Sequence, residues 1–477
     1  MKEDVIAPTV APAVPERRQC FTLHNTLLLF MLSILMFMTG VQYNISQMVS
    51  YHQSDDWKVS HTFLALEPTF LVAVIGFMAF VTGILSDRYG RKVVMGGVIA
   101  LLTSGILISG VAQEIIQYEV GRMIIGASIG ALFNLSIVMW IESSPIKFRK
   151  VGILVLMVMT SLGHASIVLY DYFIMVPYGW NAGVLFNVVV LGPCYVILYY
   201  SHESPLFVQS KGNRGLALKL ARQCGMTMED MKDKKMGGQE GKKNFRVIFS
   251  PEYRWTTVRL VLLFGLHRMV EVGLIFGVPF LLAVNFCDGP KSNIQGMPHW
   301  HGRTSDCFNS LKFSVNDYVF ISIFAILGVP GFVIGAIIQS DYLRIPDRYS
   351  ILTLSVIVGV LLVSCSICHF GLLELKLGLL RIFISSQDQV FSVLIPSVYP
   401  TEIRNGASGF VRACGIVLSS CGPFLTIWFF NYFSVTWCLV ILGFIYLIRM
   451  PLSMGLKVSS VPFVEKTDES RFETREL

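Results

Sequence analysis

An acidic residue in the middle of a long apolar run is the chain's clearest candidate for binding chemistry. Asp388 lies in the apolar run over 374–397, between Gln387 and Gln389, whose amides can orient a ligand. An ionised side chain in hydrocarbon costs several kcal/mol, so such an acid usually has a function. Asp388 has no basic residue within one helical turn, so we expect it to meet a partner on another helix or to be protonated by desolvation. Asp388 and Gln387 are therefore predicted to bind a solute or a proton.

Glu271 is the second acid of this kind, near the middle of the run over 256–284. Helical spacing places His267 four residues and Arg268 three residues before it, so a local ion pair can neutralise the acid. Two interpretations therefore stay open for Glu271, a solute or proton site and a structural ion pair.

Basic and neutral polar residues within the apolar runs extend the set of candidates. Arg412, in the run over 406–430, can neutralise Asp388 or bind an anionic solute. His164 can titrate near neutral pH, but a lone histidine among apolar residues is more often hydrogen-bonded packing. Asn134 is a weaker candidate of the same kind.

Arg381 matches Arg122 in position, since each lies early in an apolar run of its own half of the chain. Such a repeat favours a structural role for both arginines, although Arg381 is also able to neutralise an acid or bind an anion.

The elements that must position these residues are long apolar helices. The chain has 477 residues, of which 53% are hydrophobic and only 14% charged, and its mean hydropathy is +0.62. Soluble domains carry about 25% charged residues, and about 20 apolar residues are needed to cross a bilayer. Twelve runs are long enough, near 26–47, 63–86, 93–112, 116–140, 151–175, 181–200, 256–284, 317–340, 350–371, 374–397, 406–430 and 432–454. We expect an all-α polytopic membrane protein with twelve transmembrane helices in two six-helix, pseudo-symmetric halves.

The polar segments predict the division of the chain. We expect a cytoplasmic tail over 1–25, a first half over 26–200, a cytoplasmic linker over 201–255, a second half over 256–455 and a cytoplasmic tail over 456–477. The linker contains a predicted amphipathic helix, Arg214–Cys224. Of the 38 Lys and Arg residues, 27 fall in the two tails and in the alternate loops on their side, which predicts cytoplasmic termini. This placement explains the net charge of +7 without nucleic acid.

The sequence gives no support for an enzyme or a nucleotide-binding protein. Gly126–Gly130 has the spacing of a nucleophile elbow, but it falls in an apolar helix rather than a strand-turn-helix. The sequence has no phosphate-binding loop, so nothing suggests that a nucleotide drives the protein. We predict no enzymatic activity, no cofactor and no bound metal.

A charged hairpin between the second and third runs is repeated in the second half. Gly83–Lys92 carries Asp87, Arg88, Arg91 and Lys92, and a weaker copy stands at 335–344. A repeated six-helix unit points to transport.

These residues resemble the major facilitator superfamily. Gly83-x-x-x-Asp87-Arg88-x-Gly90-Arg91-Lys92 resembles its signature loop, with Gly83 and Gly90 in structural positions, and Gly121-Arg122-x-x-x-Gly126 resembles its fourth-helix motif. The segments Glu203-Ser204-Pro205 and Tyr399–Asn405 look like the organic ion transporter branch and its relatives, the synaptic-vesicle-2-like and sugar-porter groups. The resemblance covers roughly 25–455.

Departures from the organic ion pattern leave the substrate open. The long outer loop follows the seventh run, at 285–315, instead of the first, and Leu206 stands where the branch usually has Arg. The helix-eleven arginine of organic anion members would fall at Ile416, whereas this chain has Arg412. The acids of the second half favour a cationic or zwitterionic solute, while Arg381 and Arg412 keep an anion possible.

The resemblance also implies a gating network on the cytoplasmic side. Its candidates are Asp87, Arg88, Arg91, Glu142, Arg149, Glu203, Glu402 and Arg404. They would hold the inner ends of the two halves together when the site opens outward. The alternative is a set of solvated loop charges, each worth about 0–1 kcal/mol.

Cys287 and Cys307 both fall in the predicted outer loop, where a disulfide between them is plausible because that compartment is oxidising.

The function expected from these features is alternating-access transport of a small organic, charged solute, either facilitative or coupled, with protons as a possible coupling ion. The partners are then the solute and the lipid bilayer, and the location is the plasma membrane or an intracellular vesicle. The alternative is a receptor-like or vesicle-trafficking protein that keeps the fold without transporting.

Overall fold

The computed structural model describes residues 21–57, 61–227, 231, 248–251, 253–287, 315–339, 346–366, 370–399, 404–432 and 435–455, and these residues are almost entirely helical. The first half contains α1 (Leu23–Trp57), α2 (His61–Tyr89), α3 (Arg91–Gly110), α4 (Ile115–Ser143), α5 (Ile146–Tyr170), the π-helical turn η1 (Asp171–Met175), α6 (Val176–Tyr178) and α7 (Trp180–Tyr200). The second half contains α11 (Arg254–Cys287), α13 (Val315–Ile326), α14 (Gly328–Ile338), α15 (Asp347–Cys365), α16 (Phe370–Ser397), α17 (Arg404–Ser419), α18 (Cys421–Tyr432) and α19 (Val435–Met454).

Each predicted apolar run overlaps a helix or a pair of consecutive helices in the described chain. The eighth run is divided at Leu327 into α13 and α14, and the eleventh at Ser420 into α17 and α18. Pro330 and Pro423 follow these breaks within three residues, and proline is tolerated in the first turn of a helix because it has no backbone N–H to donate. Nine helical stretches of the described residues are long and apolar enough to cross a membrane by length and composition, and 322–338 forms a shorter apolar helix.

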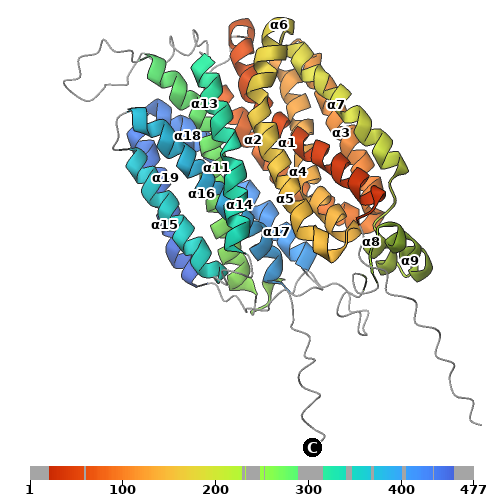
Figure 1. Cartoon of the computed structure of the whole chain (residues 1–477). Helices are drawn as coiled ribbons and strands as arrows, with labels where there is room; N and C mark the ends of the chain where they lie inside the picture. The colour runs from red at the N-terminus through yellow and green to blue at the C-terminus, as the bar shows by residue number, and fades with distance from the viewer. Residues whose placement is uncertain are drawn as a thin grey trace, which may run out of the picture.

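The two groups of helices lie side by side in Figure 1, with the red-to-yellow first half beside the green-to-blue second half. Within the first half, α3 and α2 pack on α4, and α1 packs on α5. Within the second half, α15 packs on α19, α14 on α16, and α11 on α17 and α18. The halves contact each other where α2 packs on α17 and α18, and where α5 packs on α13 and α14.

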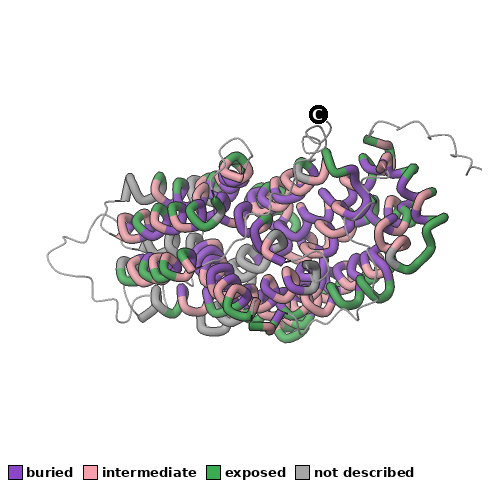
Figure 2. The backbone as a smooth tube through the Cα atoms, turned by 90° about the horizontal axis from the view of Figure 1, so that it is seen from below, coloured by how far each residue is buried: buried purple, intermediate pink, exposed green. Residues whose placement is uncertain are grey.

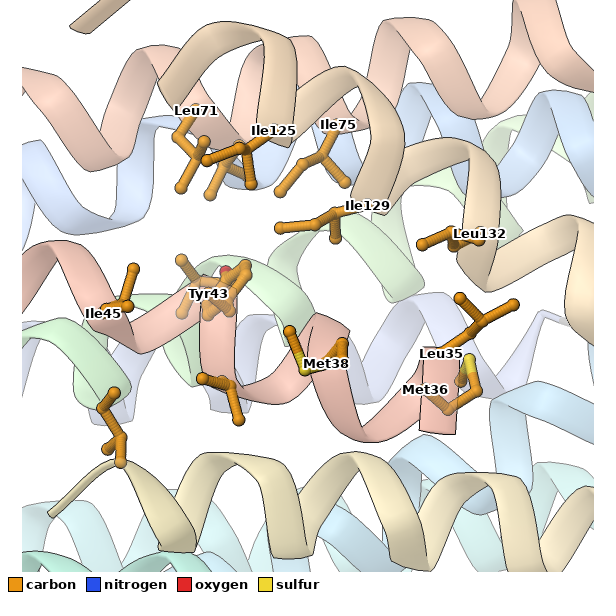
Figure 3. Close-up of a cluster of buried hydrophobic side chains, with 14 of the residues drawn as sticks. Leu35, Met36, Met38, Tyr43, Ile45, Leu71, Ile75, Ile125, Ile129 and Leu132 are labelled. Carbon is orange, nitrogen blue, oxygen red and sulfur yellow. The ribbon is translucent and has the colours of Figure 1, made fainter. Parts of the chain in front are cut away.

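Apolar side chains fill the inside of the first half. Figure 3 shows Leu35, Met38 and Tyr43 of α1 facing residues of α2 and α4 such as Leu71 and Ile129. Buried residues lie along the inner faces of the helices, whereas exposed residues lie on the outside, as seen from below in Figure 2. Because large apolar residues make up much of that outer surface, the exposed faces suit contact with lipid.

Two short helices, α8 (Pro205–Ser210) and α9 (Arg214–Gln223), follow α7 within the predicted linker. The Ser204 hydroxyl accepts a hydrogen bond from the backbone N–H of Phe207 at 3.3 Å, so Ser204 caps α8. The range of α9 agrees with the predicted amphipathic helix, and its buried face includes Ala217 and Leu220. The boundaries assigned to the tails, linker and halves stay predictions.

Candidate functional site

A cluster of charged side chains from α11 and α16 forms the centre of the candidate site. Asp388 of α16 meets two residues of α11, because its Oδ1 lies 2.9 Å from His267 Nε2 and its Oδ2 lies 3.4 Å from Arg268 Nη1. These contacts join residues more than 100 positions apart. Asp388 thus has partners on another helix, which is the first of the two outcomes expected from its sequence.

Glu271 is held between two arginines. Arg268 donates to Glu271 Oε2 from the same helix, and Arg381 Nη1 of α16 donates to Glu271 Oε1 at 3.1 Å. The local ion pair predicted from helical spacing is therefore present, and Arg381 adds a second one from across the cluster. The side chains of Glu271 and Arg381 are only 5% exposed, whereas Arg268 keeps 25% and Asp388 13%. Water and solutes can therefore reach the Asp388–Arg268 side more readily.

Behind Asp388 lies a hydrogen-bonded chain that joins Gln387, a candidate predicted from the sequence, to Tyr446, Arg449 and Ser355, which were not among the candidates. His267 Nδ1 hydrogen-bonds with the Tyr446 hydroxyl, and that hydroxyl donates to Gln387 Oε1 at 2.8 Å. Arg449 Nη1 donates to the same Gln387 oxygen at 3.2 Å, and Gln387 Nε2 donates to Ser355 Oγ at 3.0 Å. Arg449 is a charged residue inside an apolar run, so the cost argument applied to Asp388 could have found it.

This chain of donors and acceptors requires a proton beside Asp388. The single hydrogen of Tyr446 is directed to Gln387 Oε1, so His267 Nδ1 must carry a hydrogen to bond the Tyr446 oxygen. His267 Nε2 and Asp388 Oδ1 then need one more hydrogen between them. The pair is therefore either an imidazolium with a carboxylate or a neutral imidazole with a carboxylic acid.

Residues of the first half face the same cluster. Tyr43 of α1 and His164 of α5 pack ring against ring with centroids 5.5 Å apart. Both interact electrostatically with Arg268, Glu271 and Arg381. His164 therefore lies near the charged cluster, and its role in binding a solute or a proton stays a prediction.

Arg412 and Asn134 lie at different distances from this centre. Arg412 Nη2 donates to the backbone oxygen of Ser392 at 3.2 Å, and the guanidinium interacts electrostatically with Asp388 and Arg268. Asn134 Nδ2 donates to the backbone oxygen of Ala79 at 3.5 Å within the first half. Arg412 is thus a neighbour of the cluster, whereas no contact among the described residues places Asn134 in it.

His267, Glu271 and Asp388 offer ligand atoms within 4.8 Å of one another, a spacing compatible with a metal ion. Arg268 contacts both carboxylates and Arg381 contacts one of them. Two positive charges fixed on these carboxylates repel a metal cation, so the donor set suits a salt-bridge cluster better.

Arg122 occupies a separate buried cluster in the first half. Its Nε lies 3.4 Å from Glu67 Oε1, and its Nη2 donates to the backbone oxygen of Gln42 at 2.8 Å. Arg122 and Arg381 each pair with an acid on a neighbouring helix, which agrees with the structural role expected from their repeated position.

The charges of the loop at 83–92 form a second network at the other end of the first half. Arg91 donates through Nε and Nη2 to the two oxygens of Glu142 at 2.8 and 3.0 Å. Its Nη2 also lies 2.9 Å from Asp87 Oδ1, and Glu142 accepts from the Ser204 hydroxyl at 2.8 Å. These residues belong to the first half and to the segment that follows it.

Gly90 lets the linker approach this loop. Its φ of 103° lies in the left-handed region, and a Cβ there would be 2.5 Å from Glu203 Oε2. Glu203 Oε1 instead accepts from the backbone N–H groups of Arg91 and Lys92 at 2.9 and 3.2 Å. At Gly83, by contrast, a Cβ would meet no atom within 4 Å.

The remaining predicted gating residues make few contacts that bear on gating, or lie outside the described residues. Arg88 is exposed, with its guanidinium 5.4 Å from the ring of Tyr89. Arg149 Nε donates to the backbone oxygen of Ser144 at 3.1 Å. Glu402, Cys307 and the side chains of Arg404 and Cys287 lie outside the described residues, so the contact between halves and the disulfide stay predictions.

Comparison with known proteins identifies similar chains. The sequence profile of the Major Facilitator Superfamily matches residues 27–380. The synaptic vesicle 2-related protein of Pongo abelii is 26% identical over 362 residues, which are 73% of this chain and 63% of that protein, so the match spans less than two thirds of this relative. The niacin transporter NiaP of Acinetobacter baylyi is 23% identical over 220 residues, 44% of this chain and 50% of that one.

Among solved structures, the fold is similar to XylE, a major facilitator superfamily proton:xylose symporter bound to 6-bromo-6-deoxy-D-glucose. The TM-score is 0.66 at 14% identity, and the alignment covers 90% of this chain and 94% of that one.

Proposed function

We propose that this chain, which belongs to the major facilitator superfamily and is an integral multi-pass membrane protein, carries a small charged organic solute across a membrane by alternating access. The two halves would rock about the cluster of α11 and α16, opening it first to one side and then to the other. One relative is named a niacin transporter, which supports transport but does not select a solute for this chain.

The observation that carries the proposal is the buried charge cluster at the junction of the halves. Glu271 and Asp388 are held by arginines of their own half, while Tyr43 and His164 face them from the other half. Charges at such a depth are costly to maintain. Their position between the two groups of helices is where a transported solute would be bound.

The proton between His267 and Asp388 is the candidate coupling ion. Asp388 is the more accessible partner of this pair, because its side chain keeps 13% exposure, whereas that of His267 is fully buried. Release of the proton removes one positive charge from the cluster. The affinity for a charged solute would then change with the proton gradient.

Uptake into proteoliposomes tests the proposal. Purified protein is reconstituted and offered labelled organic cations, anions and sugars at two pH values. We expect uptake of at least one charged solute class. Binding of solutes without flux would refute transport and favour the receptor-like alternative.

Two conservative variants test the proton site. Asp388→Asn is expected to lose the pH dependence of uptake, because an amide cannot exchange a proton in this range. Glu271→Gln serves as the comparison, since Glu271 lies behind two arginines. Unchanged pH dependence in both variants would show that neither acid carries the proton.

A further inference from the structure

Three polar atoms converge beside Gly328, where α5, α14 and α16 meet. An atom in the Cβ position of residue 328 would lie 3.1 Å from Ser385 Oγ, 3.3 Å from Arg381 Nε and 3.3 Å from Ser161 Oγ. Because residue 328 has no side chain, these three polar atoms face the glycine backbone directly, at distances that would already crowd a Cβ. Ser161 belongs to the first half and the other two residues to the second, so the group spans the junction of the halves. We name these four residues the Gly328 cradle.

Two atoms of the Gly328 cradle have hydrogen-bonding capacity that the described residues do not meet. Arg381 Nε and Ser385 Oγ have no hydrogen-bond partner in the described part of the chain, although Arg381 is 4% and Ser385 0% exposed. The pairing of Arg381 with Glu271 uses Nη1 and leaves Nε directed elsewhere. An unmet buried donor is unfavourable, so both groups are poised to bind an acceptor.

The atoms of the Gly328 cradle select for an anionic or acceptor group. The Nε–H of Arg381 can only donate, and the two serine hydroxyls can donate at the same time. A cation offers no lone pair to these donors and is repelled by the guanidinium. The oxygens of a carboxylate can accept hydrogen bonds from donors of this kind and gain from charge-assisted bonding to arginine.

The surrounding charges also favour an anionic ligand. Within the cluster and its contacts, the described carboxylates are Glu271 and Asp388. The arginines outnumber them and are Arg268, Arg381, Arg412 and Arg449. The proton beside Asp388 adds to the positive excess. Excess buried charge is costly unless an opposite charge compensates it, and an anionic solute supplies that charge.

We propose that the transported solute carries a carboxylate or similar anionic group and that this group binds in the Gly328 cradle. The inference rests on the proposed transport function and names its substrate class. It assigns Arg381 a binding role besides its structural pairing. A carboxylate bound by Ser161 and Ser385 at once would connect α5 to α16, so its binding would favour closure of the halves around the solute.

Paired solutes of opposite charge test the substrate class. Proteoliposome uptake is measured for para-hydroxybenzoate and para-hydroxyphenyltrimethylammonium, and for further size-matched pairs of monocarboxylates and trimethylammonium ions. We expect carboxylates to be taken up and the ammonium ions to be excluded. Uptake of the ammonium ions instead would overturn the anion assignment while leaving transport intact. Absence of uptake for every solute, sugars included, would refute the transport function itself.

Small-residue variants test the location of the site. The double variant Ser161→Ala with Ser385→Ala removes two donors and is expected to raise the half-saturating carboxylate concentration about ten-fold or more. Ser166→Ala is the matched control, because the Ser166 hydroxyl of α5 donates within its own helix to the Gly163 oxygen. Equal half-saturation in the double variant and the wild type would overturn the placement in the Gly328 cradle.

Gly328→Ala places a methyl group between the three polar atoms and is expected to lower carboxylate uptake further. Its thermal unfolding midpoint is measured alongside, so that loss of binding is separated from loss of folding. If Gly328→Ala unfolds, the serine double variant still decides the outcome.

Discussion

Replacing Arg91 by alanine is expected to destabilise the first half more than any other single change in the loop at 83–92. The guanidinium makes two parallel bonds to Glu142, one bond to Asp87 and one to the Ser86 backbone oxygen at 2.8 Å. It also lies 4.7 Å from the ring centroid of Phe207 in α8. The side chain thus joins α2, α4 and the start of the linker.

The magnitude follows from burial. Arg91 is 6% and Glu142 12% exposed in their side chains, so their pair counts as buried, whereas Asp87 at 46% is largely solvated. Removing one partner of a buried pair costs about 3–5 kcal/mol because the other charge is left without compensation. The exposed pair with Asp87 adds only about 0–1 kcal/mol. The expected total is therefore about 3–5 kcal/mol.

Thermal unfolding of the protein in lipid nanodiscs measures this effect. Arg88→Ala is the matched control, because it removes the same side chain three residues earlier from an exposed position. Its expected cost is about 0–1 kcal/mol, from an exposed cation–π contact with Tyr89. Arg91→Lys is expected to fall between the two, since an ammonium keeps the charge but not the two parallel bonds. Equal unfolding midpoints for Arg91→Ala and Arg88→Ala would refute the reasoning.

Two further experiments test the same end of the molecule. Gly90→Ala is expected to lower the free energy of unfolding by about 1–3 kcal/mol, because φ is 103° and the methyl group would meet Glu203 Oε2 at 2.5 Å. Gly83→Ala is the control, since a Cβ there would meet no atom within 4 Å. It is expected to be neutral or slightly stabilising in the same unfolding assay. Burial raises the pKa of the Cys224 thiol to about 12, so the thiol stays protonated at neutral pH and its labelling by maleimide is expected to be slow until the protein is unfolded. Asn25→Ala removes the bond that Asn25 Nδ2 donates to the Cys224 oxygen at 2.8 Å and is expected to speed labelling; an unchanged rate would show that this bond does not hold the linker in place.

Most helices could be predicted from the sequence, because a membrane-spanning helix depends on consecutive residues and not on contacts with distant parts of the chain. About 20 consecutive apolar residues form a helix in lipid whatever their neighbours are. The runs predicted near 93–112 and 181–200 therefore differ from α3 and α7 by two residues or fewer at each end. The amphipathic helix over Arg214–Gln223 was found for the same reason, since periodicity is also local.

The partners of the charged residues could be predicted only in part from the sequence. The pair Arg268–Glu271 follows from helical spacing, which is a short-range rule. The contact of Asp388 with His267 joins α16 to α11 over 121 positions and follows from helix packing alone. The cost of a charge in an apolar run could have singled out Arg449, but nothing in α19 itself identifies Gln387 as the partner of Tyr446 and Arg449.

The sequence by itself determined that this chain crosses a membrane, that its buried charges need partners, and that Arg122 and Arg381 repeat. The first two follow from the cost of apolar surface in water and of charge in lipid, which depends on residue type, and the third from matching positions in the two halves. The tertiary structure alone decided which side chains meet, because helices from both halves bring together residues far apart in the chain. Ser161 of α5 meets Arg381 and Ser385 of α16 around Gly328 in this way, and no residue spacing in the sequence predicts that they meet.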